Sequence, residues 1–272
     1  MTMETFTGLI NSYLPEPHAS LLNGMVLGRK LFVTDTFYEQ LKIVGLIHIV
    51  VLSGSNISML SAIIMNLIVK RVGLRLSVVF TIAAISFFIW FVGAEPPVVR
   101  AGIMGVLSLS AGLFGRKTLA IYTLFVSSVM MILINTSWLT SISFQLSVAA
   151  TLGIILFGNY ESNDPSINSA TWGSIWRYFY EELRISVAAQ VFTLPIIFWY
   201  FRSISLVAPL ANILISWLVA PIMVLGLLIL VIGNISWNTG FVLSWIAYGM
   251  LQLIIWIVEI LARLPYAQIK II

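Results

Sequence analysis

The chain contains no cysteine and only two histidines among its 272 residues. The first absence excludes disulfide bonds, thiolate metal sites and a cysteine nucleophile. The second excludes a histidine-rich metal centre, because such a centre needs several imidazoles. Charged residues are also scarce, at 9% of the chain, whereas soluble domains carry about 25%. These shortages exclude an ordinary cytosolic enzyme, a disordered tail and a collagenous protein.

Apolar residues are abundant instead: 60% of the chain is hydrophobic, and the mean hydropathy is +1.05. They form continuous runs of roughly 17 residues or more, which is the length a helix needs to cross the hydrocarbon layer of a membrane. Strands of a membrane barrel alternate over about ten residues, unlike these runs. The sequence therefore predicts an all-α, polytopic transmembrane helix bundle.

About eight spans are predicted. They cover residues 44–69, 76–92, 98–115, 119–134, 139–158, 185–201, 206–232 and 241–264. Residues 1–42 are the least hydrophobic large stretch, and the apolar run 19–28 within them is too short to cross a membrane. We interpret residues 1–42 as an interfacial segment containing one helix, and residues 43–272 as a single transmembrane domain.

Three prolines fall inside predicted spans. Pro195 is expected to interrupt the sixth span, and Pro209 and Pro221 the seventh. A backbone carbonyl freed by proline must find protein or water within a membrane. Two interpretations stay open: simple kinks in a packed bundle, or broken or re-entrant helices that line a wet cavity.

The distribution of basic residues predicts the orientation. Connections 70–75 and 116–117 carry three and two basic residues, whereas connections 93–97 and 135–138 carry none. Basic loops stay on the cytoplasmic side. Alternation through eight spans then puts both termini on the outer side of a multi-pass cell-membrane protein, although the Lys and Arg residues before residue 42 argue slightly against this.

The first predicted span is polar along one side. On one helix, His48, Ser55, Ser58 and Asn66 would fall within an arc of about 80°. Polar groups are costly in hydrocarbon, so this side is expected to face the bundle interior. For His48 and Asn56, a packing hydrogen bond and a role in lining a passage both stay open.

Five sequence blocks carry a resemblance to a known family. In chain order they read LPEPHASLLNGMVLG, GLIHIVVLSGSNIS, PPVVRAGIMGVLSLSAGLFGRK, SFQLSVAATLGIILFG and VAPLANILISWLVAPIMVLGLL. With these blocks, from about residue 14 to residue 264, the chain resembles the competence domain of the ComEC family of DNA-uptake proteins. It departs from the family where Ser-Gly-Leu-His is common, because Ser53-Gly54-Ser55-Asn56 stands there.

The resemblance implies a bacterial inner-membrane channel that imports single-stranded DNA during natural transformation. Its path should offer scattered cations, hydroxyls and amides rather than one tight site. The positions that match the family blocks are His48, Ser53, Gly54, Asn56, Arg100, Gln145 and Asn212. Each has a plainer interpretation: boundary snorkelling for Arg100, an interhelical hydrogen bond for Gln145, and helix capping for Asn212.

We expect no enzymatic activity, no cofactor and no metal. His48 and Ser53 would lie about 140° apart on a helix, which does not suit a catalytic dyad. The chain has no His-x-His cluster for a nuclease metal site and no Walker-type glycine loop. The expected partners are therefore single-stranded DNA, membrane lipids, and a separate DNA receptor, nuclease and cytoplasmic motor.

Two other functions stay open at this point. One is a secondary transporter of a small anionic solute that uses the proline-containing spans. The other is a membrane scaffold of a DNA-uptake complex, in which the polar groups serve only packing. Faces rich in Gly and Ser are also compatible with a homodimer.

Overall fold

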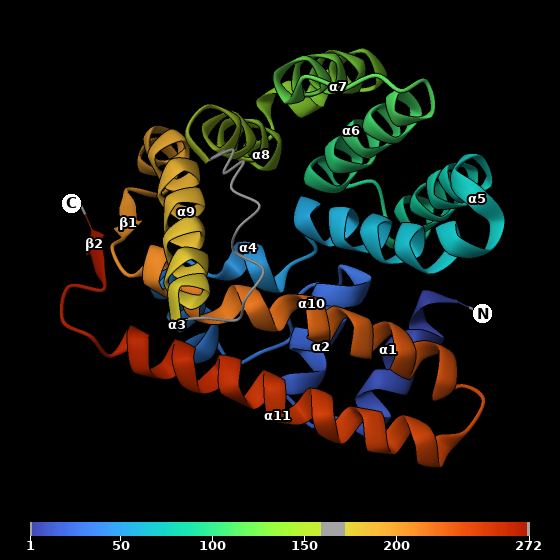
Figure 1. The fold of residues 1–272 in the computed structure, drawn as a ribbon. Coiled ribbons are helices and arrows are strands. Elements are labelled where there is room, and N and C mark those ends of the chain that lie inside the picture. Colours follow the sequence, from blue (N-terminus) through green and yellow to red (C-terminus); the bar gives the residue numbers. More distant parts are fainter. Residues whose placement is uncertain (1, 159–171, 271–272) are drawn as a thin grey trace.

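The computed structural model describes residues 2–158 and 172–270, and these residues form a bundle of helices with one small sheet (Figure 1). The all-α class is confirmed. The elements are α1 (Met3–Tyr13), α2 (His18–Leu27), α3 (Asp35–Val44), α4 (Ile47–Val50), α5 (Gly54–Val92), α6 (Pro96–Leu113), α7 (Ala120–Ile134), η1 (Thr136–Thr140), α8 (Ile142–Gly153), η2 (Ile154–Gly158), α9 (Trp172–Phe201), β1 (Ser203–Ser205), α10 (Ala208–Ile232), α11 (Trp237–Ala262) and β2 (Gln268–Lys270).

Within residues 2–158 and 172–270, five helical stretches are long and apolar enough to cross a membrane. They are Ile47–Val92, Pro96–Leu113, Phe179–Phe201, Ala208–Ile232 and Trp237–Ala262. Two shorter apolar stretches are Ala120–Ile134 and Ile142–Gly158. The chain is therefore a multi-pass membrane protein, while the number of eight crossings stays a prediction.

The helix α5 is two helices joined by a turn. Gly73 has φ 78° and ψ 168°, a conformation that only glycine adopts without strain. The two halves pack together, because the Thr81 hydroxyl lies 3.9 Å from the Met65 sulfur. The turn falls inside the basic connection 70–75 that the sequence predicts between the first two spans.

The prolines change the helices less than we predicted. The helices α9 and α10 are continuous across Pro195 and Pro221, and Pro209 lies in the first turn of α10. The expected interruption at Pro209 is wrong, because a proline in the first helical turn removes an N–H that has no helical partner there. Re-entrant geometry stays a prediction.

A buried apolar core surrounds α2. All ten residues of α2 are buried, and they pack with apolar side chains of α1, α3, α10 and α11. Gly226 lets α10 approach α2 closely, because a Cβ atom there would lie 2.5 Å from a Val26 methyl group. The helix predicted near residues 19–28 is thus present, but protein contacts it on all sides. Its interfacial position in a membrane stays a prediction.

Local sequence fixes the ends of the helices around this core. Gly28 ends α2 and Gly45 ends α3, each in the left-handed conformation, with φ 65° and 78°. Such residues commonly terminate helices, because glycine has no Cβ to clash there. Pro96 and Pro97 begin α6, where their fixed φ suits the first turn. The strands β1 and β2 pair antiparallel, with Ile204 opposite Ile269.

Candidate functional site

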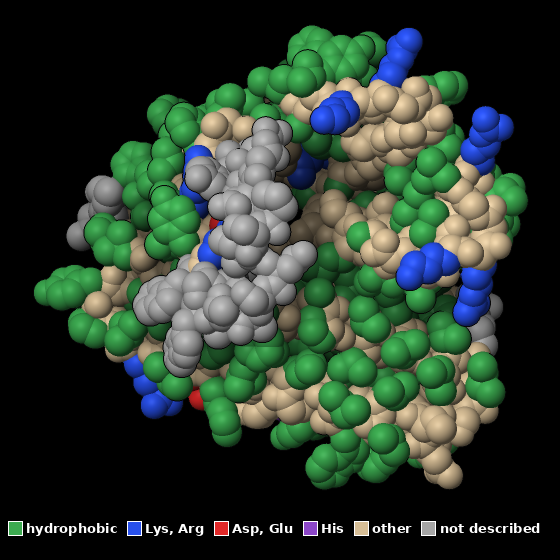
Figure 2. All heavy atoms as spheres, viewed as in Figure 1, with side chains coloured by type: hydrophobic (Ala, Val, Ile, Leu, Met, Phe, Trp, Pro, Cys, Tyr) green, Lys and Arg blue, Asp and Glu red, His purple; other side chains and the backbone are tan. Residues whose placement is uncertain are grey.

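One face of the molecule is hollowed between α5 and α6 on one side and α8 and α9 on the other (Figures 1 and 2). The face carries several Lys and Arg side chains on an otherwise apolar surface (Figure 2). Contacts between α5, α6 and α8 meet beside this hollow, and four of the seven predicted site residues take part in them or lie next to them. We call this set the junction cluster: Ser53, Gly54, Asn56 and Arg100.

The junction cluster begins where α4 ends. Val51 and Ser53 are extended, so α4 and α5 are separate helices. The Ser53 hydroxyl lies 2.7 Å from the Ser55 hydroxyl and donates to the Asn56 carbonyl oxygen at 3.2 Å. The Asn56 amide donates to the Met25 carbonyl at 3.0 Å and is fully buried. Asn56 therefore fastens the start of α5 to α2.

Arg100 lies in the second turn of α6 and is only 8% exposed. Its guanidinium donates to the Ser147 carbonyl and the Thr151 hydroxyl of α8. A Cβ atom at Gly54 would lie 3.2 Å from the Arg100 guanidinium. The glycine thus allows α5 to approach α6 at this point, and Arg100 lies where the three helices meet.

The charge of Arg100 has no acidic partner among the described residues, whose two salt bridges join other side chains. Its Nε atom is buried without a hydrogen-bond partner. A buried charge is expensive unless it is paired, and buried polar atoms nearly always have partners. The arrangement is therefore suited to attracting an anion, with the Thr151 hydroxyl in contact with the guanidinium.

The other three predicted site residues make hydrogen bonds away from the junction cluster. The Gln145 amide donates to the Leu139 carbonyl at 3.0 Å. The Asn212 amide donates to the Ser186 hydroxyl at 2.7 Å and joins α10 to α9, while its own carbonyl oxygen is buried and unpartnered. The His48 Nδ1 atom lies 2.9 Å from the Gly45 carbonyl. A shared passage for all seven residues stays a prediction.

The expected polar side of the first span needs correction. His48 is not on α5, because the extended segment before Gly54 separates it from that helix. Ser55, Ser58 and Asn66 are exposed rather than turned to the bundle interior. The buried polar residues of α5 are instead Asn56, Ser77 and Thr81. The break at residues 51–53 removes His48 from the predicted polar side, and the other three residues of that side share a face of α5 that the fold leaves exposed.

A polar cavity that the sequence did not predict lies on another part of the molecule. It has a volume of about 410 Å³ and is lined in part by His18, Gln252 and Glu259. The His18 ring stacks on Tyr248, and its Nε2 atom lies 2.8 Å from the Gln252 carbonyl oxygen. Burial lowers the pKa of His18 from its ordinary value of 6.5. Gln252 and Glu259, one polar and one acidic residue on the apolar helix α11, were the signal in the sequence.

Ser147 and Thr151 were missed for a different reason. They stand four residues apart on α8, so they share one face of that helix. Hydroxyl residues on an apolar helix are common, and only the position of Arg100 distinguishes these two. Gln145 is two residues before Ser147 and therefore points away from that face.

The fold, the apolar helices and the buried cation define a multi-pass helical membrane protein with a polar junction between its helices. The family model for the competence protein family matches residues 25–272. The chain belongs to this family, which confirms the relationship that the five sequence blocks indicate.

A curated relative gives the same relationship. The chain is 23% identical over 227 residues to ComE operon protein 3 of Bacillus subtilis (strain 168). The match covers 81% of this chain and 28% of the relative, so the chain spans less than a third of the length of that protein. No solved structure matches the chain.

Proposed function

We propose that the chain forms an inner-membrane conduit for single-stranded DNA during natural transformation. Its membership of the competence protein family supports a role in DNA uptake. The observation that carries the proposal is Arg100, a buried cation that forms no salt bridge with a carboxylate among the described residues and lies where α5, α6 and α8 meet. It lies within an apolar bundle, where an ionisable side chain indicates a functional site.

The chemistry of the junction cluster suits a moving polyanion. A phosphodiester needs positive charge and hydrogen-bond donors, which the Arg100 guanidinium and the Thr151 hydroxyl provide. Because these groups are few, they compensate the charge of the strand without holding it tightly. A conduit has to release its cargo, so weak and scattered contacts are an advantage.

In this proposal the chain transports and does not catalyse. A separate DNA receptor delivers the strand, a separate nuclease removes its complement, and a cytoplasmic motor pulls it. The conduit has both chain ends on the outer side of the membrane, and a homodimer is compatible with it. The proposal requires no cofactor.

The first experiment is deletion of the gene, followed by separate assays of transformation and of DNA binding at the cell surface. A conduit predicts that transformation is lost while surface binding remains. Complementation with the wild-type gene should restore transformation, which serves as the control for effects on neighbouring genes. Transformation at the normal level in the deletion strain would overturn the proposal.

A small-anion transporter is the second candidate, because a single buried guanidinium with a neighbouring hydroxyl is also a compact anion site. Purified chain in phosphate- or carboxylate-loaded vesicles distinguishes the two. Saturable anion flux that Arg100→Gln abolishes would favour the transporter. A strand that crosses while anion flux stays at the background level would favour the conduit.

A further inference from the structure

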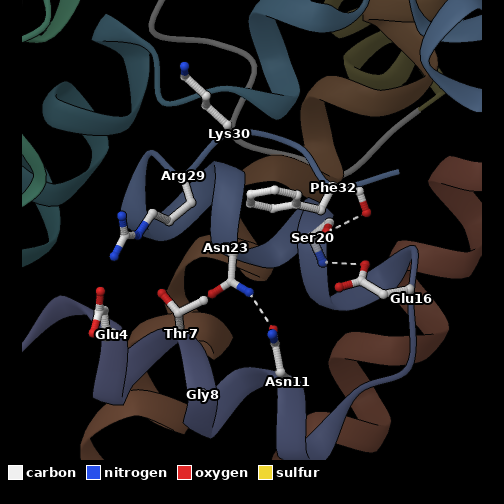
Figure 3. A pocket seen from close by; sticks show the side chains of 10 residues that line it. All are labelled: Glu4, Thr7, Gly8, Asn11, Glu16, Ser20, Asn23, Arg29, Lys30 and Phe32. Carbon is white, nitrogen blue, oxygen red and sulfur yellow. Dashed lines mark hydrogen bonds between the residues drawn. The ribbon is translucent and has the colours of Figure 1, made fainter. Parts of the chain in front are cut away.

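A second polar cavity lies between α1, α2 and the segment that follows α2 (Figure 3). Its volume is about 380 Å³, within the usual range of about 300 to 1,000 Å³ for small-ligand sites. The junction cluster does not line it. We call it the N-terminal pocket, and five of its residues carry the argument: Asn11, Asn23, Arg29, Lys30 and Phe32.

The inner wall of the N-terminal pocket is a pair of amides. The Asn23 amide donates to the Asn11 carbonyl oxygen at 2.8 Å. Asn23 is only 4% exposed, and its own carbonyl oxygen has no hydrogen-bond partner. Figure 3 shows this side chain pointing into the pocket. Since a buried acceptor without a partner is costly, the oxygen is suited to a donor on a ligand.

Two cations stand on the side of the pocket next to the end of α2. Gly28 ends that helix, and Arg29 and Lys30 follow it directly. Neither cation forms a salt bridge within the part of the chain that the structure describes, and the Nε atom of Arg29 is buried without a partner. The pocket also contains Glu4 and Glu16, and the latter accepts a bond from the Ser20 backbone. The ligand must therefore carry both an anionic group and hydrogen-bond donors.

An aromatic ring completes the N-terminal pocket. Phe32 is 78% exposed, and Figure 3 shows its ring between Arg29 and Ser20. A hydrogen bond fixes the Phe32 backbone to α2, because the Ser20 hydroxyl donates to the Phe32 carbonyl at 3.0 Å. An exposed aromatic ring beside cations is the arrangement on which nucleic-acid bases stack.

We propose that the N-terminal pocket binds one nucleotide unit of single-stranded DNA. Arg29 contacts the phosphate, and Lys30, whose side chain points away from the pocket in Figure 3, turns toward the phosphate on binding. The base stacks on Phe32, and an exocyclic amine of the base donates to the Asn23 carbonyl oxygen. The choice of DNA rests on the proposed function, whereas the pocket is separate from the junction cluster. Cytosine, adenine and guanine carry such an amine and thymine does not. The pocket therefore favours deoxycytidine over thymidine.

The test is equilibrium binding of fluorescent homopolymers to the full chain in lipid nanodiscs. Phe32→Ala should lower the affinity about tenfold, since stacking contributes about 1–3 kcal/mol per base and about 1.4 kcal/mol is tenfold. Lys30→Gln should weaken deoxycytidine and thymidine homopolymers equally and reduce the salt dependence. Asn23→Ala should remove the preference for deoxycytidine.

Matched controls come from the connection after α6. Phe114 is 79% exposed, close to Phe32, and Lys117 is exposed like Lys30. Phe114→Ala and Lys117→Gln should leave the affinity within about twofold of wild type, because neither residue lines the pocket. Equal losses in Phe32→Ala and Phe114→Ala would overturn the proposal, and so would a wild-type chain that binds neither homopolymer.

The nature of the ligand is tested in the same assay. A phosphatidylethanolamine headgroup also combines a phosphodiester with donors, so vesicles of that lipid are added as a competitor. Displacement of the oligonucleotide at the N-terminal pocket would identify a lipid site and overturn the nucleotide assignment. The two proposals can be overturned separately. If the N-terminal pocket binds no nucleotide but the chain is a conduit, transformation still depends on the gene. If the chain is not a conduit, transformation does not depend on the gene.

Discussion

The region around α2 and the region from α5 to α8 are built in different ways. Every residue of α2 is buried, whereas only four of the fifteen residues of α7 are, and two of those four are Thr123 and Ser127. Apolar packing dominates the first region. In the second, Arg100 connects α6 to α8 through polar contacts. The comparison indicates a rigid apolar frame that carries a more polar, less tightly packed part.

The largest effect is expected at Arg100. Arg100→Leu should lower transformation more than about tenfold, because it removes the only charge of the junction cluster along with its two bonds to α8. Arg100→Lys keeps the charge and should retain part of the activity. Transformation frequency is measured together with the amount of protein in the membrane. Equal frequencies for the two variants would mean that the charge is irrelevant.

The stability of the apolar region around α2 should be sensitive to added side-chain volume. Gly226→Ala places a methyl group 2.5 Å from a Val26 methyl group, and overpacking of this kind costs about 1–3 kcal/mol. Gly249→Ala is the matched control, because no atom lies within 4 Å of the added methyl group. Thermal unfolding in detergent should show a lower Tm for Gly226→Ala alone. The same Tm for both variants would contradict a tightly packed frame.

Asn56 connects the two regions. Asn56→Ala removes the bond to the Met25 carbonyl and leaves that acceptor unpaired, which should cost about 1–2 kcal/mol of unfolding free energy. Asn66→Ala removes an exposed amide from the same helix and should cost less than about 0.5 kcal/mol. Denaturant unfolding followed by tryptophan fluorescence measures both. A larger loss of unfolding free energy in Asn66→Ala than in Asn56→Ala would contradict the role of Asn56 as the connection between the two regions.

The smallest effect is a dependence on pH. Burial lowers the pKa of His18 in the folded chain below its unfolded value of 6.5, so the folded state favours the neutral ring. Stability from His18 is therefore complete above pH 6.5 and is lost as the pH falls below that value toward the folded pKa. His18→Gln should flatten the pH dependence of Tm in this range. If the pH dependence of Tm is the same in His18→Gln and in the wild type, His18 is not its cause.

The sequence predicted the apolar helices well, because their lengths and the basic connection around Gly73 are local properties. It did not predict that α2 is buried by protein, since α10 and α11, which cover it, lie about 200 residues further along the chain. Arg100 was predicted as a site residue from the sequence blocks, whereas its contacts with α8 depend on tertiary packing. The prediction of a buried polar side was wrong for two reasons. The break between α4 and α5, which no proline marks, separates His48 from the other residues, and tertiary packing leaves Ser55, Ser58 and Asn66 exposed.

In the proposed function the junction cluster borders a hydrated passage for DNA, and labelling of an introduced cysteine can show whether it does. The chain has no cysteine, so an introduced one is unique. Ser53→Cys is compared with Ser86→Cys, whose site is exposed beside Phe87 and Trp90 on an apolar face of α5. A charged, membrane-impermeant thiol reagent should modify the first and block DNA import, while the second stays unmodified and active. Modification of Ser86→Cys alone, or full import after Ser53→Cys has reacted, would contradict the claim.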